Sequence, residues 1–222
     1  MTRNRALLLS LLLVLTSVAV SIWAYPQVPA QVPSHFDISG HVDGYLPKLV
    51  GIGLWPVLLL VLSLLIPILP AISPKGFRLE QSADVLNLVL LGVMVVEFVA
   101  SVFVIRASLG KAAPPVGLTN LMLGALFVLI GNYMGKIRKN FFFGVRTPWT
   151  LASDEVWLKT HRCSGWLWVI GGITLAVLGF VNADATTAIT VVVSILVVVP
   201  VAYSFVLYKR IEGFTINGSN GS

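Results

Sequence analysis

Two histidines and two aspartates lie within nine residues of one another, a combination of side chains that could bind a divalent metal ion. The cluster stands in the proline-rich segment 25–48, and its members, with an intervening aromatic residue, are His35, Phe36, Asp37, His41 and Asp43. Their spacing fits no paired metal-ligand motif on a regular helix or strand. The alternative is that the aspartates cap turns beside glycines that supply positive φ. Both interpretations stay open, and we predict no resident metal or cofactor.

The segment 135–164 is a second polar stretch, in which basic and aromatic side chains alternate. Three consecutive phenylalanines at 141–143 are followed by Trp149 and Trp157. Aromatic rings favour the headgroup zone of a membrane, and lysine and arginine favour the anionic lipid of the inner leaflet. The pattern predicts an interfacial anchor or, alternatively, a surface that binds a peptide or a cytoplasmic protein.

A helix is expected to begin within this second stretch, at Ser153. Serine is a typical N-cap residue, and two acidic residues follow it in the first turn, where the helix dipole favours negative charge. Aromatic and polar side chains then recur at intervals of three and four residues, at Trp157, His161, Ser164 and Trp168. This spacing places them on one helix face that leads into an apolar span.

The composition of the whole chain indicates that its main solvent is lipid. The 222 residues are 57% hydrophobic and 11% charged, and the mean hydropathy is +0.92. Soluble domains average roughly 25% charged residues, so this chain could not cover itself with polar surface in water. The composition excludes a soluble enzyme, a nucleic-acid binder and a secreted disulfide scaffold, and the single Cys163 cannot form an internal disulfide.

Six apolar stretches approach the length of about 20 residues that a helix needs to cross a bilayer. The backbone cannot leave hydrogen bonds unmade in lipid, so each stretch is expected to be helical. The prediction is an all-α polytopic membrane protein with six transmembrane helices, over 6–24, 49–72, 85–105, 116–134, 165–181 and 186–208. The first run also resembles a signal peptide, but it exceeds the usual apolar core of about 7–15 residues, which favours a retained helix.

We divide the chain into two parts on this pattern. Residues 1–72 form an N-terminal helix pair that carries the extracytoplasmic proline-rich loop 25–48. Residues 73–222 form a four-helix membrane region that carries the polar loop 135–164.

The distribution of basic residues predicts the orientation. Twelve of the fifteen lysines and arginines lie on the side of the termini and of the loop 135–164, and three (Lys48, Arg106 and Lys111) lie on the other. Cytoplasmic loops are enriched in these residues, so both termini are expected in the cytoplasm of a cell-membrane protein.

Within the predicted spans, Glu97 stands as a lone ionisable residue near the middle of the third. A carboxylate at this depth is costly and is expected to face other helices. It marks either a substrate or proton pathway or a structural polar contact. Three prolines in the second span (Pro56, Pro67 and Pro70) and Pro200 in the sixth could also open a site between broken helices.

Motifs of catalysis are missing from the sequence. The chain has no His-Glu-x-x-His, no Gly-x-Ser-x-Gly and no phosphate-binding Gly-Lys-Thr loop. His161 and Cys163 are two residues apart, so a helix points them in different directions. We predict that the protein is not an enzyme.

The two polar loops resemble a known family. The string Gly-x-Arg-Thr-Pro-Trp-Thr at 144–150 is similar to the signature of the SdpI family, and the loop 32–44 resembles the small domain of unknown function that often precedes it. The signature residues of the cytoplasmic loop are Asn132, Asn140, Gly144, Arg146, Thr147, Pro148, Trp149, Trp157 and His161.

The resemblance implies a membrane immunity protein that protects a bacterium against its own secreted antimicrobial peptide, the cannibalism toxin. The best-known member also acts as a receptor and holds a cytoplasmic autorepressor at the membrane. The expected partners are therefore membrane lipid, a peptide toxin and a transcriptional repressor, without direct binding of nucleic acid. The outer loop with His35, Asp37 and Asp43 would capture the toxin, and the loop around Arg146 would face the cytoplasmic partner. A small proton-coupled transporter that uses Glu97 is the alternative function.

Overall fold

The computed structural model of the chain describes residues 1–36, 42–75, 77, 79–111, 116–181 and 185–213. Among these residues, six helices are long and apolar enough to cross a membrane, as predicted. They are α1 (Arg3–Ala24), α2 (Lys48–Ala71), α3 (Ala83–Ser108), α4 (Val116–Met134), α6 (Asp154–Phe180) and α7 (Ala185–Ile211). Shorter elements connect them: strands β1 (Gln31–Phe36) and β2 (Val42–Pro47), the 3₁₀ helix η1 (Leu79–Ser82) and helix α5 (Pro148–Ala152).

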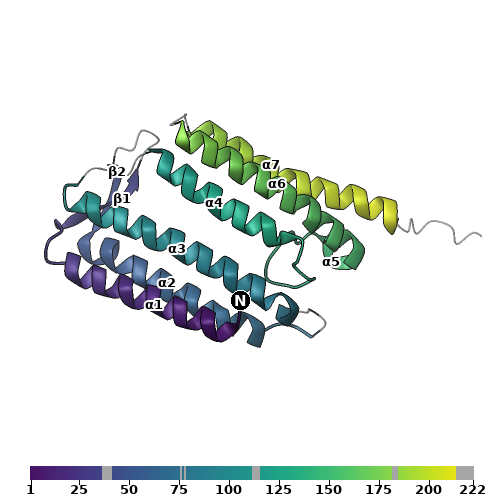
Figure 1. Cartoon of the computed structure of the whole chain (residues 1–222), viewed down its shortest axis with the longest axis horizontal. Helices are drawn as coiled ribbons and strands as arrows, with labels where there is room; N and C mark the ends of the chain where they lie inside the picture. Colours follow the sequence, from purple (N-terminus) through teal and green to yellow (C-terminus); the bar gives the residue numbers. More distant parts are fainter. Residues whose placement is uncertain (37–41, 76, 78, 112–115, 182–184, 214–222) are drawn as a thin grey trace, which may run out of the picture.

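The long helices form two groups that lie side by side (Figure 1). In one group α1, α2 and α3 contact one another pairwise, and in the other α6 packs along both α4 and α7. The groups meet where α3 contacts α4. The two strands lie at one end of the bundle, and α5 with the C-terminal end of α7 lies towards the other.

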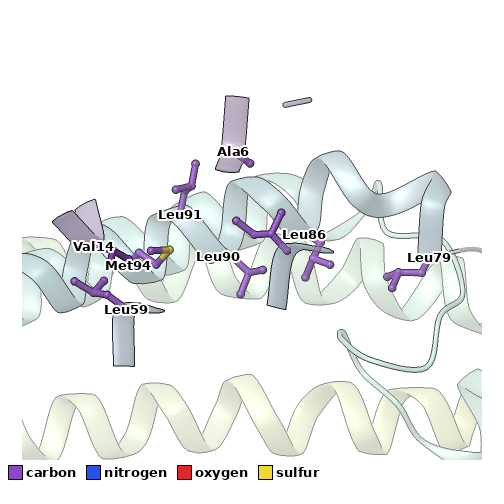
Figure 2. Packing of buried hydrophobic residues seen from close by; sticks show 9 residues of the cluster. Ala6, Val14, Leu59, Leu79, Leu86, Leu90, Leu91 and Met94 are labelled. Atoms are coloured by element: carbon purple, nitrogen blue, oxygen red, sulfur yellow. The ribbon is translucent and has the colours of Figure 1, made fainter. Parts of the chain in front are cut away.

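The first group buries small and apolar side chains and exposes leucines, as a helix bundle in lipid does. On α1 the buried residues recur every three or four positions and are Ala6, Ser10, Val14, Ser17, Ser21 and Ala24. Large neighbours such as Leu8 and Leu12 are 69% and 61% exposed. Figure 2 shows Val14, Leu59 and Met94 meeting in the core between the three helices. Since lipid tails are as apolar as leucine, close packing of the small residues holds such helices together.

Glycines allow the backbones of α4 and α6 to pack at a short distance from each other. A Cβ atom on Gly124 would lie 2.5 Å from the carbonyl oxygen of Gly172, and one on Gly131 would lie 2.7 Å from that of Gly165. The contacts repeat every seven residues along both antiparallel helices, in the pairs Gly117–Gly179, Gly124–Gly172 and Gly131–Gly165. The two backbones are therefore in direct contact, and side chains larger than hydrogen are excluded along this seam.

The prolines leave the helices continuous. α2 contains Pro56, Pro67 and Pro70 and runs unbroken to Ala71, and α7 continues through Pro200. The sequence-based expectation that these prolines open a site between broken helices is not met. Membrane helices tolerate proline because neighbouring helices and local adjustments satisfy the freed backbone groups.

The proline-rich segment forms a hairpin rather than a simple extended loop. β1 pairs with β2 in an antiparallel register in which Val32 lies opposite Leu46. Val32 is fully buried in a cluster with residues from the ends of α1, α2 and α3, and its side chain fills the space beside Gly51 where a Cβ would otherwise stand. The backbone N–H of Lys48 donates to the carbonyl of Ala30 at 2.9 Å and closes the base of the hairpin.

Candidate functional sites at the two ends of the bundle

The hairpin end, defined as residues 31–36 and 42–47, presents a pair of exposed polar side chains. Nδ1 of His35 lies 2.5 Å from Oδ1 of Asp43, and the side chains are 72% and 49% exposed. Tyr45, on the same strand as Asp43, is 57% exposed. This surface offers a histidine, a carboxylate and a phenol ring to a ligand in the surrounding medium.

Other members of the predicted outer cluster cannot be placed against this pair. Asp37 and His41 lie outside the described residues, and Phe36 is described by its backbone alone. Within the described part of the chain, no group of three or more metal-ligating side chains comes together. The arrangement that the structure does describe is the His35–Asp43 pair.

The loop end, defined as residues 135–161, is organised around the buried side chain of Asn140. Its Nδ2 donates to the carbonyls of Arg138 and Phe143 at 3.0 and 3.2 Å. Its Oδ1 accepts from the backbone N–H groups of Phe142 and Phe143, both at 2.9 Å. All four bonding positions of the amide are used, so Asn140 folds the triple-phenylalanine turn.

His161 connects this turn to α6 as a neutral imidazole. The N–H of Val145 donates to its Nε2 at 3.0 Å, and its Nδ1 lies 2.8 Å from the carbonyl of Trp157. Because a backbone N–H can only donate, Nε2 carries no proton and Nδ1–H is the donor to Trp157. Gly144 lies directly against the imidazole with φ +102°, a conformation and a spacing that exclude a side chain.

Trp157 is the centre of the buried face that the sequence predicted on α6. The side chain is 1% exposed, its ring stacks on His161 at a centroid distance of 4.0 Å, and its Nε1 donates to the carbonyl of Ile137 at 2.8 Å. His161 and Ser164 are also fully buried, which confirms the predicted helix face.

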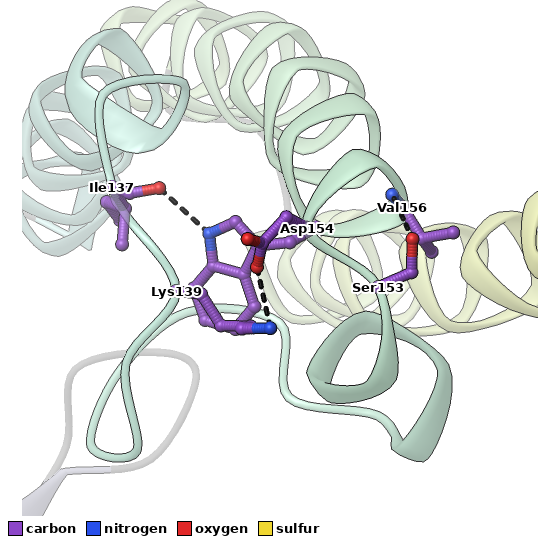
Figure 3. A network of polar contacts seen from close by, with 6 residues as sticks. Ile137, Lys139, Ser153, Asp154 and Val156 are labelled. Atoms are coloured by element: carbon purple, nitrogen blue, oxygen red, sulfur yellow. Dashed lines mark hydrogen bonds and ion pairs between the residues drawn. The ribbon is translucent and has the colours of Figure 1, made fainter. Parts of the chain in front are cut away.

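An ion pair and an N-cap hydrogen bond stabilise the start of α6 beside the loop (Figure 3). The side chain of Ser153 accepts from the N–H of Val156, which confirms the predicted N-cap. Lys139 and Asp154 form an ion pair of 2.6 Å, and the carboxylate also lies in the first turn, where the helix dipole favours it.

The signature Thr-Pro-Trp-Thr forms the short helix α5, which the sequence analysis did not predict. Thr147 and Thr150 form a reciprocal capping box, with Pro148 at the first helical position. The hydroxyl of Thr147 also lies 3.0 Å from that of Ser204 on α7, and the rings of Trp149 and Phe205 meet edge to face. The capping threonine followed by proline is a recognisable helix start that could have revealed α5.

The structure thus separates the predicted signature residues into two sets. Asn140, Thr147, Trp157 and His161 are buried and shape the loop end from within. The exposed signature residues are Asn132, Gly144, Arg146 and Pro148, and Trp149 is half-buried. Arg146 donates to the carbonyl of Phe141, so its guanidinium lies over the phenylalanine turn and faces outward.

Inside the predicted spans, two described polar residues have buried side-chain atoms without hydrogen-bond partners. Glu97 on α3 has a buried Oε1, and Asn120 on α4 is fully buried, yet among the described residues neither Oε1 of Glu97 nor either amide atom of Asn120 has a hydrogen-bond partner. Glu97 was expected from the sequence and Asn120 was not, although an amide within an apolar span is unusual enough to have indicated it.

Two segments of the chain, one containing each end of the bundle, match known protein-family models. Residues 136–204, from the loop end into α7, match the family model described as the SdpI/YfhL protein family. Residues 12–60, from α1 through the hairpin into α2, match a domain of unknown function, DUF1648. A curated relative, "Immunity protein SdpI" of Bacillus subtilis (strain 168), is 26% identical over 208 residues, which cover 93% of this chain and 97% of the relative. No solved structure matches the chain.

Proposed function

We propose that this chain, whose residues 136–204 match the SdpI/YfhL protein family, is a membrane immunity protein that gives resistance to a secreted antimicrobial peptide of the cannibalism type. The observation that carries the proposal is the similarity to an immunity protein along nearly the whole length of both chains. The role proposed is protective and non-enzymatic.

The proposed orientation places the hairpin end outside the cell membrane and the loop end in the cytoplasm. Six basic residues belong to the segment between α4 and the inner part of α6, namely Lys136, Arg138, Lys139, Arg146, Lys159 and Arg162. The positive-inside asymmetry supports a cytoplasmic position for this segment and for both termini.

In this orientation the hairpin end is the surface that an arriving toxin meets first. His35 and Asp43 hold one another in a fixed geometry on adjacent strands, and the buried Val32 anchors the strands to three helices. A rigid surface loses little entropy when it binds a peptide. Asp37 and His41, in the segment between the strands, belong to the same proposed toxin-binding loop.

The loop end is the proposed contact for a cytoplasmic partner, such as a repressor held at the membrane. Arg146 supports this assignment because it is exposed, while the residues that hold its loop are buried. Toxin binding outside would regulate this contact only if the toxin has different affinities for two states of the helix bundle.

The test is survival of toxin-sensitive bacteria that express variants at equal levels in the membrane. Asp43→Ala, Asp37→Ala and Arg146→Ala are each expected to reduce protection. Gln27→Ala, at an exposed position before β1 and outside the hairpin end, is the matched control and is expected to protect like the unmodified chain. Full protection by all three site variants would contradict the assignment of the two ends.

A second candidate function is a small proton-coupled transporter, and the buried, unpartnered Oε1 of Glu97 favours it. Glu97→Gln removes the ionisable group with little change in shape. If the protein is a transporter, this variant abolishes resistance that depends on the proton gradient. If it protects by binding, Glu97→Gln protects like the unmodified chain.

A further inference from the structure

A groove between α4 and α6, next to the loop end, is lined by two polar side chains that make no contact needed for packing of the described part of the bundle. Its volume is about 250 Å³. α4 and the residue after it contribute Gly131, Asn132 and Gly135, and α6 contributes Arg162, Gly165, Trp166 and Val169. Because Gly131 and Gly165 carry no side chains, the backbones of the two helices meet directly beside the groove.

The groove opens on the side of α6 that faces lipid. Trp166 is 73% exposed, and Ile170 and Ile173, one and two turns further along, are 59% and 52% exposed. Exposed large apolar residues at these spacings form a continuous stripe on one helix face. A molecule in the groove would therefore contact the acyl chains of the bilayer.

The polar side chains in the groove are free to bind an anion. Among the described residues, no carboxylate forms an ion pair with Arg162, and the two acidic residues at the start of α6, Asp154 and Glu155, pair with Lys139 and Lys159. The exposed amide of Asn132 likewise has no hydrogen-bond partner in the described part of the chain. The lining thus offers a guanidinium and an amide, with no opposing carboxylate.

The depth of Arg162 matches that of a phosphate group. Along α6, Arg162 and Phe180 are 18 residues apart, which corresponds to about 27 Å of helix. This is close to the roughly 30 Å thickness of the hydrocarbon core. If Phe180 marks one boundary of the core, Arg162 marks the other, with the indole of Trp166 just inside it, as in the aromatic belts of membrane proteins.

We propose that this groove binds one anionic phospholipid, with its phosphate on Arg162 and Asn132 and an acyl chain along Gly165 and Val169 beside Trp166. The guanidinium fork matches the geometry of phosphate oxygens, and basic pockets between transmembrane helices bind anionic headgroups. The bound lipid fills the groove and bridges α4 to α6. This site is independent of the immunity function, since it requires neither toxin nor repressor.

The test uses the purified full-length protein reconstituted in vesicles of phosphatidylglycerol and phosphatidylcholine, with retained lipid counted by native mass spectrometry. The unmodified protein is expected to retain one phosphatidylglycerol in preference to phosphatidylcholine. Arg162→Gln is expected to lower that preference about fivefold, since a basic residue near an anionic surface contributes about 1 kcal/mol. Arg210→Gln, an exposed arginine at the end of α7, is the matched control and is expected to leave it unchanged.

Gly135→Leu tests the groove without removing the charge. A Cβ at Gly135 would meet its nearest atom, Cγ of Arg162, at an ordinary contact distance of 3.5 Å, and we expect the rest of the leucine side chain to occupy the groove that Gly135 lines. Loss of the bound lipid in this variant supports the proposal. Equal retention by Arg162→Gln, no preference in the unmodified protein, or displacement of the lipid by inorganic phosphate at constant ionic strength would each overturn it.

Discussion

The two polar ends of the bundle use their polar side chains in opposite ways. At the loop end, Asn140, His161 and Trp157 are buried and direct their hydrogen bonds inward to the backbone. At the hairpin end, His35 and Asp43 bond to each other on an exposed surface. The longer sequence signature, at the loop end, therefore consists largely of residues that stabilise the fold. The shorter one, at the hairpin end, leaves its side chains available to a ligand.

The largest effect is expected from Gly144→Ala. The new methyl group would meet the His161 ring, and alanine is strained at φ +102°, so the protein should lose about 2–3 kcal/mol of stability or more. Thermal unfolding in detergent, followed by a thiol-reactive dye at Cys163, measures the loss. Gly110→Ala is the matched control, since its φ is +70° and no atom lies within 4 Å of the added Cβ; it should cost less, and equal losses would contradict a role for the His161 contact.

Asn140→Ala is expected to have the next largest effect. It removes four hydrogen bonds to the backbone and leaves buried amide and carbonyl groups without partners, at a cost of about 1–3 kcal/mol. The same substitution at the exposed Asn132, which makes no hydrogen bond within the described residues, should change the melting temperature little. Similar melting temperatures for the two variants would contradict the claim that the buried signature residues stabilise the fold more than the exposed ones do.

Thr147→Val should have a smaller effect, because it removes the side-chain cap of α5 and the contact with Ser204 but preserves the shape. A lost helix cap costs about 1 kcal/mol. The same thermal assay measures the change, and easier proteolysis near residue 150 would show that α5 has detached from α7. An unchanged protease pattern and melting temperature would contradict a role for Thr147 in docking α5.

The smallest effect on stability is expected at the hairpin end. His35→Ala breaks an exposed pair, and exposed pairs contribute at most about 1 kcal/mol. The melting temperature should change little, while protection against the toxin should fall. A His35→Ala variant that is strongly destabilised but still protects would show that His35 serves stability and not binding, which contradicts the role assigned to the hairpin end.

The sequence predicted what depends on local patterns. Apolar length revealed the six helices, and serine followed by two acidic residues revealed the start of α6. The glycine seam was not predicted, although Gly117, Gly124 and Gly131 recur every seven residues and could have indicated it. The contact between Gly144 and His161 was not, because it joins residues 17 positions apart through a fold that no local pattern encodes.

Prolines gave the wrong local prediction in two places. The four prolines of the segment 25–48 disfavoured a prediction of strands, yet the strands pair and Val32 packs against Gly51 of α2. In α2, Pro56 and Pro67 suggested breaks that packing within the bundle overrides. In both cases tertiary contacts outweigh the local preference of the residue.

Immunity is tested most directly by the survival of a toxin-sensitive bacterium that expresses this chain, challenged with the cannibalism peptide and with an unrelated membrane-active peptide. We expect protection against the first peptide and none against the second, and we expect Asp43→Ala to reduce protection at an unchanged amount of protein in the membrane. Equal killing with and without the chain, with the protein verified in the membrane, would contradict the immunity function.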